Sequence, residues 1–162
     1  KQAGKRLRPR EIRLRRTGPP TRRRIYTTFR TWPPVTEVRQ PQGTLDDFTY
    51  YEVDSMTFAS SAGREKDKSV IIYNDRITLK DIPIEAYNYV VNGQSAIEWI
   101  MDQYRVKVDP DSGIRSDPNA WCREHNDPAY ILNLLKRVIR VSMETNRIVA
   151  NLPSLELERT SA

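Results

Sequence analysis

Cysteine and histidine are almost absent from this 162-residue sequence, in which Cys122 and His125 are the only residues of these two types. A single cysteine excludes a disulfide framework, and two ligands are too few for a structural zinc site within one chain. No run of about 18 apolar residues could span a bilayer, and no apolar segment near the N-terminus indicates a secretory signal. We therefore expect a cytoplasmic protein without membrane association.

Complete catalytic motifs are missing as well. The sequence has no Gly-x-x-x-x-Gly-Lys-Ser/Thr loop for a nucleotide, and no set of nucleophile, base and acid, because His125 is the only histidine. Asp109-x-Asp111-x-Gly113 begins like a calcium loop but lacks its later Gly and Glu. We expect no catalytic residue, no metal and no cofactor here, and hence a binding or specificity module.

Charge is plentiful but unevenly distributed, since 27 basic and 21 acidic residues give a formal net charge of +6. Residues 1–43 contain 13 of the basic residues and only two acids, Glu11 and Glu37. Residues 44–162 are left with 14 basic and 19 acidic residues, a net charge of −5. This change predicts two different segments, a basic Arg/Pro-rich arm over 1–43 and a mildly acidic body over 44–162.

Prolines interrupt the basic arm too often for a long helix, so we expect an extended segment with one short strand at Ile25–Trp32. Arginine side chains neutralise phosphates, and rings such as Tyr26, Phe29 and Trp32 stack on bases, a combination that suits nucleic acid. Three other interpretations stay open: a solvated tail, a segment packed against other parts of a larger protein, and an artificial extension.

The body is predicted to be α+β, with a small β-sheet that contains a hairpin, followed by a helical C-terminal part. Val70–Tyr73 and Arg76–Leu79 are β-rich runs around Asn74-Asp75, a pair that tolerates left-handed φ and therefore predicts a hairpin. One or two strands are also expected within residues 45–60, and Gly63–Lys68 is expected to be a polar loop.

Two short helices are expected after the hairpin. Pro83 can open the first, over Ile84–Tyr89. After a turn at Asn92-Gly93, Ser95 and Glu98 form a capping box before a helix from Ala96 to about Tyr104. The composition of Asp109–Gly113 and of Asp117–Asn119 predicts turns, and Trp99 and Trp121 are expected to fill the core rather than to stack on bases.

A long C-terminal helix is predicted after Asp127, its expected cap, with Pro128 at the first position. Asn126–Tyr130 also resembles the Asp/Asn-Pro-Pro-Tyr/Phe site of adenine-N6 methyltransferases, but that site needs a preceding strand. Residues at three- and four-residue steps predict one continuous apolar stripe on this helix: Ile131, Leu134, Leu135, Val138, Val141, Thr145, Ile148, Val149 and Leu152.

A series of unusual motifs follows one order along the body. They are Ile71–Leu79, Ile82-Pro83, Glu85–Tyr87, Val91–Trp99, Asp102–Val106, Asp109-x-x-Ser112-Gly113-Ile114, Asp117-Pro118-Asn119-x-Trp121 and Val138–Val149. In this order the motifs resemble the C-terminal end of type ISP restriction–modification proteins, which are also described as predicted helicases. The resemblance covers roughly residues 48–153 and does not extend to residues 1–43.

Proteins of that family are single polypeptides with a nuclease, a superfamily 2 helicase-type ATPase, an adenine-N6 methyltransferase and a C-terminal target-recognition domain. The resemblance implies that this chain is the distal part of the target-recognition region of a bacterial protein, and that it is itself non-catalytic. It also implies two partners, double-stranded DNA and the upstream methyltransferase and helicase domains of the same polypeptide.

Exposed cations beside turns are the candidate DNA contacts, because phosphate contacts supply most of the affinity and a few side chains read base edges. These candidates are Arg64, Lys66, Lys68, Arg76, Lys80, Arg105, Lys107 and Arg115. Two alternatives remain: a structural docking module that braces the methyltransferase or helicase part, which the acidic body favours, and a small basic RNA-binding protein.

Overall fold

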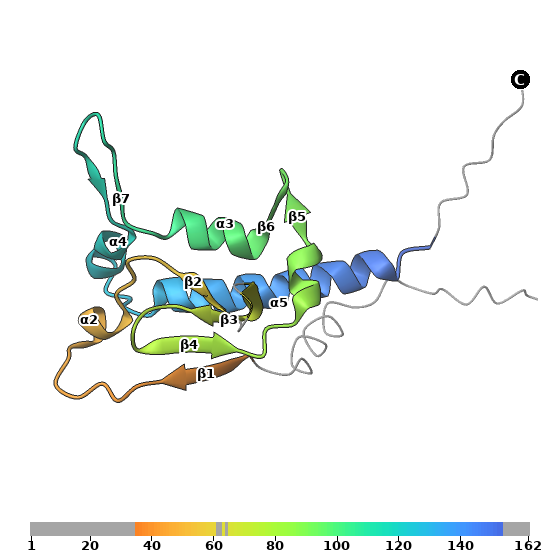
Figure 1. Cartoon of the computed structure of the whole chain (residues 1–162), viewed down its shortest axis with the longest axis horizontal. Coiled ribbons are helices and arrows are strands. Elements are labelled where there is room, and N and C mark those ends of the chain that lie inside the picture. Colours follow the sequence, from red (N-terminus) through yellow and green to blue (C-terminus); the bar gives the residue numbers. More distant parts are fainter. Residues whose placement is uncertain (1–34, 61–62, 64, 154–162) are drawn as a thin grey trace, which may run out of the picture. The chain divides into compact units, whose positions relative to one another are not determined.

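A four-stranded antiparallel sheet organises the part of the chain that the computed structural model describes, residues 35–60, 63 and 65–153 (Figure 1). Its strands are β1 (Thr36–Arg39), β2 (Thr57–Ser60), β3 (Lys66–Ile72) and β4 (Ile77–Lys80), in the order β1-β4-β3-β2. The sheet and the helices after it confirm the α+β prediction. The strand predicted at Ile25–Trp32 lies outside the described residues.

The β3–β4 hairpin confirms the strand pair predicted from the sequence. Its turn is organised by Asn74, whose Oδ1 accepts hydrogen bonds from the backbone N–H groups of Arg76 (2.9 Å) and Ile77 (2.7 Å). Neither Asn74 nor Asp75 has a positive φ, so the expected left-handed turn is wrong. The Asn74 carboxamide stabilises the turn instead, because an Asn side chain can replace a backbone acceptor in a turn.

Strand β1 belongs to the sheet, although the charge pattern places its residues in the basic arm. It pairs with β4 so that Glu37 lies opposite Leu79, and opposite residues in a sheet share a face. Glu37 therefore points toward the core side, where Lys136 of the last helix donates a hydrogen bond to it (2.9 Å). The sheet thus includes residues before position 44, where the net charge changes sign.

Four α-helices and one 3₁₀-helix occur in the described part of the chain. They are α2 (Asp47–Tyr51), η1 (Ile84–Asn88), α3 (Ala96–Gln103), α4 (Pro118–Glu124) and α5 (Tyr130–Ala150). Helices η1 and α3 confirm the two short helices expected from the sequence, and Ser95 Oγ accepts a hydrogen bond from the Glu98 N–H (3.2 Å) as the capping box requires. None of these helices has the length and apolar character that a membrane span requires.

The sequence patterns do not predict α2 and α4. Helix α2 lies within the 45–60 segment that is expected to form strands, and Asp46 caps it by accepting from the Thr49 N–H (3.0 Å). Helix α4 begins where a turn is expected, with Asp117 accepting from the Asn119 N–H (2.9 Å) and a proline at the first turn. An Asp-Pro pair suits a helix start as well as a turn, and here it starts a helix.

Helix α5 begins later than predicted. Its N-cap residue is Ala129 and no side chain caps it, so the expected roles of Asp127 and Pro128 are wrong. Helix α4 ends at Glu124, Asn126 beyond it has a φ of 52°, and the Asp127 N–H donates to the Cys122 carbonyl (3.0 Å). Residues 125–129 therefore form the connection that joins α4 to α5.

The buried face of α5 also differs from the predicted stripe. Ile131 and Leu135 are buried as expected, and Leu132, Ile139 and Met143 join them. The stripe residues nearer the C-terminus are 50–63% exposed: Val141, Ile148, Val149 and Leu152. The last turns of α5, which include Ile148 and Val149, run past η1 and leave the sheet behind (Figure 1). Val141 is instead followed directly by the buried Ser142 and Met143, so it faces away from the core within the packed part of the helix.

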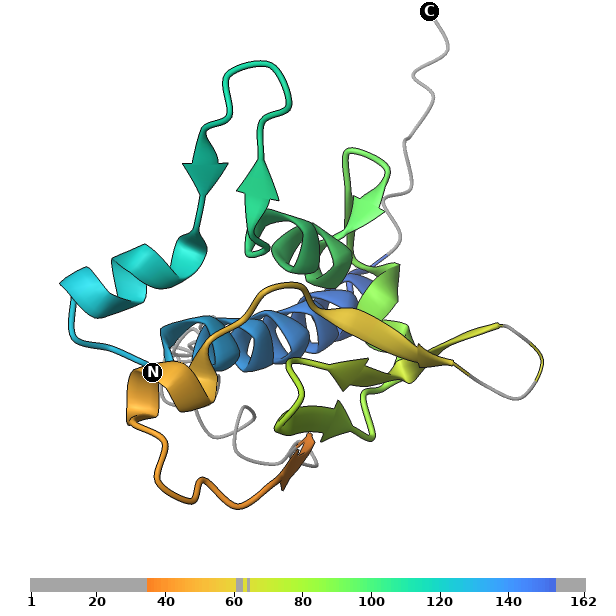
Figure 2. The same cartoon turned by 60° about the vertical axis from the view of Figure 1, so that its left-hand side comes forward.

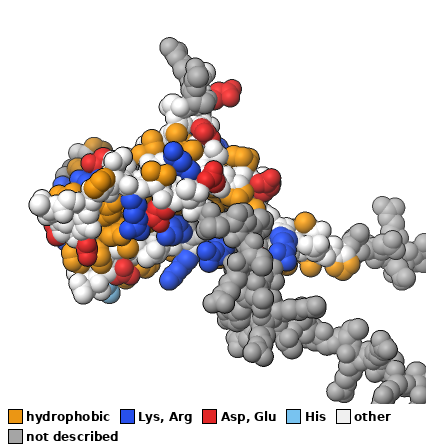
Figure 3. Space-filling model, turned by 90° about the horizontal axis from the view of Figure 1, so that it is seen from below, with side chains coloured by type: hydrophobic (Ala, Val, Ile, Leu, Met, Phe, Trp, Pro, Cys, Tyr) orange, Lys and Arg blue, Asp and Glu red, His pale blue; other side chains and the backbone are white. Residues whose placement is uncertain are grey.

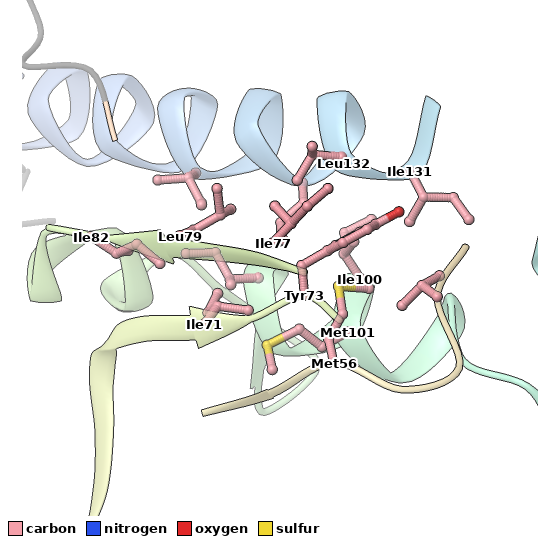
Figure 4. Packing of buried hydrophobic residues seen from close by; sticks show 14 of the residues in the cluster. Met56, Ile71, Tyr73, Ile77, Leu79, Ile82, Ile100, Met101, Ile131 and Leu132 are labelled. Carbon is pink, nitrogen blue, oxygen red and sulfur yellow. The ribbon is translucent and has the colours of Figure 1, made fainter. Parts of the chain in front are cut away.

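The hydrophobic core lies between the sheet, α3 and α5 (Figure 4). Fully buried side chains come from all three parts: Ile71, Tyr73, Ile77 and Leu79 from the β3–β4 hairpin, Ile97 from α3, and Ile131, Leu132 and Leu135 from α5. The Tyr73 hydroxyl donates a hydrogen bond to the Tyr51 carbonyl (2.9 Å), which satisfies the one polar atom that this ring buries. Burial raises the pKa of Tyr73, so its hydroxyl stays protonated.

Two short hairpins flank α3 along the chain (Figure 2). The first pairs β5 (Val90–Val91) with β6 (Gln94–Ser95), and the second pairs β7 (Lys107–Val108) with β8 (Arg115–Ser116). Both predicted turns, at 92–93 and 109–113, are confirmed as the connections of these hairpins.

Candidate nucleic-acid interface

An open groove of about 670 Å³ lies between the β2–β3 hairpin and α3. Its polar walls include Lys66 from the start of β3, Gln94 from β6 and Arg105 from the segment after α3, and its apolar floor includes Met56 and Met101. Three segments far apart in the sequence thus bring a lysine, an amide and an arginine around one depression. An open groove with cations at its walls suits an extended anionic partner.

Four of the eight predicted cations lie in this groove or beside it. Lys66 and Arg105 line it, Lys68 is paired with the lining residue Glu98, and Lys107 is paired with the lining residue Asp102. Arg64 lies outside the described residues. The groove therefore brings together only half of the predicted DNA-contact residues.

Arg105 and Lys107 share a single carboxylate. Asp102 lies 3.0 Å from an Arg105 guanidinium nitrogen and 3.4 Å from Lys107 Nζ. Both cationic side chains are well exposed, so the ion pairs add little to stability. Two cations against one carboxylate leave an excess positive charge at this end of the groove.

The Lys68 side chain contacts other residues of the fold. Its Nζ lies 2.8 Å from Glu98 Oε1, and it stands 5.9 and 5.2 Å from the ring centroids of Phe58 and Tyr87. The Tyr87 hydroxyl also donates to the Lys68 carbonyl (2.7 Å). These contacts hold β3 against η1 and α3, so Lys68 shapes the groove wall.

The pKa of Glu98 reflects this pairing. Burial raises the pKa, but the hydrogen bonds that Glu98 accepts from Lys68 (2.8 Å) and from the Ser95 hydroxyl (2.6 Å) outweigh burial, so the pKa lies below its ordinary value. A carboxyl group with a lowered folded-state pKa adds stability above its unfolded pKa, and that stability is lost as the pH falls through the folded pKa.

Replacing Lys68 with methionine is therefore expected to lower the free energy of unfolding by about 1 kcal/mol at neutral pH, since an ion pair and two cation–π contacts are lost. The pKa of Glu98 should rise in the variant, so the difference from the wild type should shrink below about pH 4. Urea denaturation at neutral pH and below about pH 4 measures the free energy of unfolding of each protein. Lys80→Met is the matched control, because Lys80 is exposed and its side chain is not ion-paired to any described residue. If the difference in the free energy of unfolding between wild type and Lys68→Met stayed constant with pH, that result would contradict the role of Glu98.

The other predicted cations lie away from the groove. Arg76, in the β3–β4 turn, donates to the Thr49 carbonyl (3.1 Å) and pairs with Asp75 (3.1 Å). It lies beside a second depression of about 490 Å³ that is also lined by Glu52, Asp54 and Asp75, a poor environment for phosphate. Lys80 ends β4, and Arg115 lies in β8 near Asp117 (3.7 Å). The eight candidates are thus not one patch.

Basic side chains are not confined to the groove. On the face that Figure 3 shows, Lys and Arg side chains gather near the middle of the view, next to acidic and hydrophobic ones. A mutational test of the groove therefore needs control substitutions that change the net charge equally elsewhere.

Trp99 and Trp121 contradict the expectation that they fill the core, since Trp99 is 50% and Trp121 is 41% exposed. Trp99 stands two positions from both Ile97 and Met101, and two steps on a helix turn a side chain away from the face of its neighbours. Trp121 packs at the surface against His125, with ring centroids 3.9 Å apart, and against Tyr130 at 4.2 Å.

Cys122 and His125 have no further metal ligands beside them in the described part of the chain. Cys122 is buried on the core side of α4, where burial raises the pKa of its thiol, and His125 stacks on Trp121. The described residues contain no group of three or more His, Cys, Asp or Glu side chains that could hold a metal ion.

Gln94 is one of the groove residues that the sequence prediction, which is restricted to cations, does not include. A search for cations passes over an uncharged amide, although its position directly after the Asn92-Gly93 turn marks it as the first strand residue beyond a hairpin tip. That position is the signal by which sequence reasoning could have found it.

A model of the Type ISP C-terminal specificity domain family matches residues 3–134. The match begins within the basic arm, so the expectation that the family resemblance stops short of residues 1–43 is wrong. A comparison with curated proteins finds no match.

Solved structures give the same family. A nuclease-deletion mutant of the type ISP restriction–modification enzyme LlaGI, in complex with a DNA substrate mimic, is 44% identical over 76% of this chain, with a TM-score of 0.62. The ATP-dependent type ISP enzyme LlaBIII, bound to DNA, is 40% identical over 78%, with a TM-score of 0.63. A DrdV–DNA complex shares the fold at 22% identity over 78% of this chain, with a TM-score of 0.50. This chain covers 10%, 8% and 13% of those three chains.

Proposed function

This chain belongs to the Type ISP C-terminal specificity domain family, and we propose that it is the DNA target-recognition module of a multidomain restriction–modification protein. The observation that carries the proposal is the family match over residues 3–134. In this proposal the module is non-catalytic. The nuclease, helicase-type ATPase and methyltransferase activities belong to upstream domains of the same polypeptide, which acts in the bacterial cytoplasm.

The groove between the β2–β3 hairpin and α3 supports this function. Lys66, Arg105 and Lys107 offer cations to phosphate groups, which provide the sequence-independent part of DNA affinity. Gln94 and Arg105 have side chains of the types that read base edges. One open surface therefore offers both kinds of contact that target recognition needs.

A second function, docking against the methyltransferase or helicase part, is favoured by one observation. The C-terminal half of α5 and the two residues after it expose four apolar side chains on the described surface: Val141, Ile148, Val149 and Leu152. Exposed apolar patches of this kind typify protein–protein contacts. The two functions use different elements, so one chain can have both.

The experiment that tests target recognition uses the full-length protein and the same protein without this chain. Both are mixed with random duplex DNA, and the bound fraction is sequenced at several salt concentrations. We expect the full-length protein to select one sequence, with an affinity that falls steeply with salt, by about 0.9 in logarithmic slope for each phosphate contact. Removal of this chain should abolish selection, whereas unchanged selection would leave docking as its function.

A further inference from the structure

We propose that Gln94, at the tip of the β5–β6 hairpin, reads the edge of one base pair in the groove, while Lys66 and Arg105 hold the DNA from its walls. This inference rests on the proposed function and adds to it a residue that determines specificity.

The hairpin presents Gln94 on a well-defined support. The turn residues Asn92 and Gly93 have φ values of 54° and 79°, as a two-residue type I′ turn requires, and that turn matches the twist of the strands it joins. Gln94 pairs with Val91 directly behind the turn. Helix α3 begins only two residues later, at Ala96, and its capping box fixes the base of the hairpin. A short, tight support restricts where the amide can point.

The side-chain amide of Gln94 has no hydrogen-bond partner among the described residues, and its side chain lines the groove in an exposed position. An amide presents both a donor and an acceptor. These two groups match the N6 and N7 atoms of adenine, the base that Gln contacts through two hydrogen bonds in the major groove.

The carboxylates near Gln94 in the groove are already paired within the fold. Glu98 is occupied by Lys68 and Ser95, and Asp102 by Arg105 and Lys107. Both groove carboxylates are therefore neutralised by cations and present little repulsion to DNA. Lys66 has no ion-pair partner in the described part of the chain, so it is available to a phosphate.

The test uses the full-length protein with Gln94→Ala, and measures its affinity for the selected duplex and for every single-base-pair variant of that duplex. We expect discrimination to fall about 5- to 150-fold at one base pair, where the target has adenine, and to persist at the others. Gln94→Glu should move the preference at that pair from adenine toward cytosine, because a carboxylate accepts from the cytosine amino group. The salt dependence should stay unchanged in Gln94→Ala, since neither a charge nor a phosphate contact is removed.

Gln103→Ala is the matched control, because it removes the same exposed side chain from the other end of α3. Its discrimination should equal that of the wild type. If Gln94→Ala discriminates at every base pair as the wild type does, the inference is overturned and the proposed function stands. If the wild type itself does not discriminate between sequences, the proposed function fails first.

Discussion

Replacing Asn119 with alanine is expected to lower the free energy of unfolding by about 2–4 kcal/mol. The Asn119 side chain accepts a hydrogen bond from the Val53 N–H (3.0 Å) and donates to the Val53 carbonyl (2.7 Å) and to Asp117 (2.8 Å). Asn119 and Val53 are both buried. Alanine would leave the two backbone groups of Val53 without partners, and such buried groups cost more than an ordinary hydrogen bond contributes.

The same substitution should disturb the groove. The segment after Val53 supplies Ser55 and Met56 to the groove lining, and the Asp54 carbonyl accepts a hydrogen bond from the Val106 N–H (2.8 Å). Loss of the Asn119 clamp removes the two hydrogen bonds that hold the Val53 backbone directly before this lining. We therefore expect weaker DNA binding by the full-length variant in addition to lower stability.

Urea denaturation of wild type and Asn119→Ala measures the change in stability, and Asn133→Ala is its control. Asn133 lies exposed on α5, and its side chain has no hydrogen-bond partner among the described residues. The control should stay within about 0.5 kcal/mol of the wild type. A similarly small change in Asn119→Ala would show that the Val53 backbone finds other partners.

The elements predicted from the sequence are those whose signals are local. The β3–β4 hairpin, the Asn92-Gly93 turn and the Ser95–Glu98 capping box each depend on residues a few positions apart, and all three occur. The Asn119–Val53 clamp joins residues 66 positions apart, so no local sequence pattern predicts it. The groove is likewise built by β3, β6 and the end of α3, so only the tertiary fold brings Lys66, Gln94 and Arg105 together.

Two of the wrong predictions, the buried tryptophans and the buried stripe of α5, have one physical cause, because the residue type alone does not determine burial. Trp99 and Trp121 are apolar in part but lie on outward faces of α3 and α4. Ile148 and Val149 continue the apolar spacing of α5 beyond Met143, the last core residue of this helix among the described residues. Periodicity predicts which residues share a helix face, but the neighbouring elements decide how far along the helix that face is buried.

Reversing the charge of Lys66, Arg105 and Lys107 together is expected to weaken DNA binding by the full-length protein about 100-fold or more at moderate salt. Three phosphate contacts would be lost, so the slope of the logarithm of affinity against the logarithm of salt concentration should fall by about 3. Lys68 is left unchanged because its contacts with Glu98, Phe58 and Tyr87 make it part of the fold.

The control variant reverses Arg137, Arg140 and Arg147, three exposed cations of α5 that lie outside the groove lining and are not candidate DNA contacts. It changes the net charge by the same amount, so the general field of the protein acts equally on both variants. Binding titrations at several salt concentrations, with circular dichroism to verify the fold, should show the groove variant at least about tenfold weaker than the control. Equal losses in the two variants would mean that DNA responds to net charge alone. A loss confined to the groove variant would locate the phosphate contacts on the walls around Gln94, because the only difference between the two proteins is where the charge was reversed.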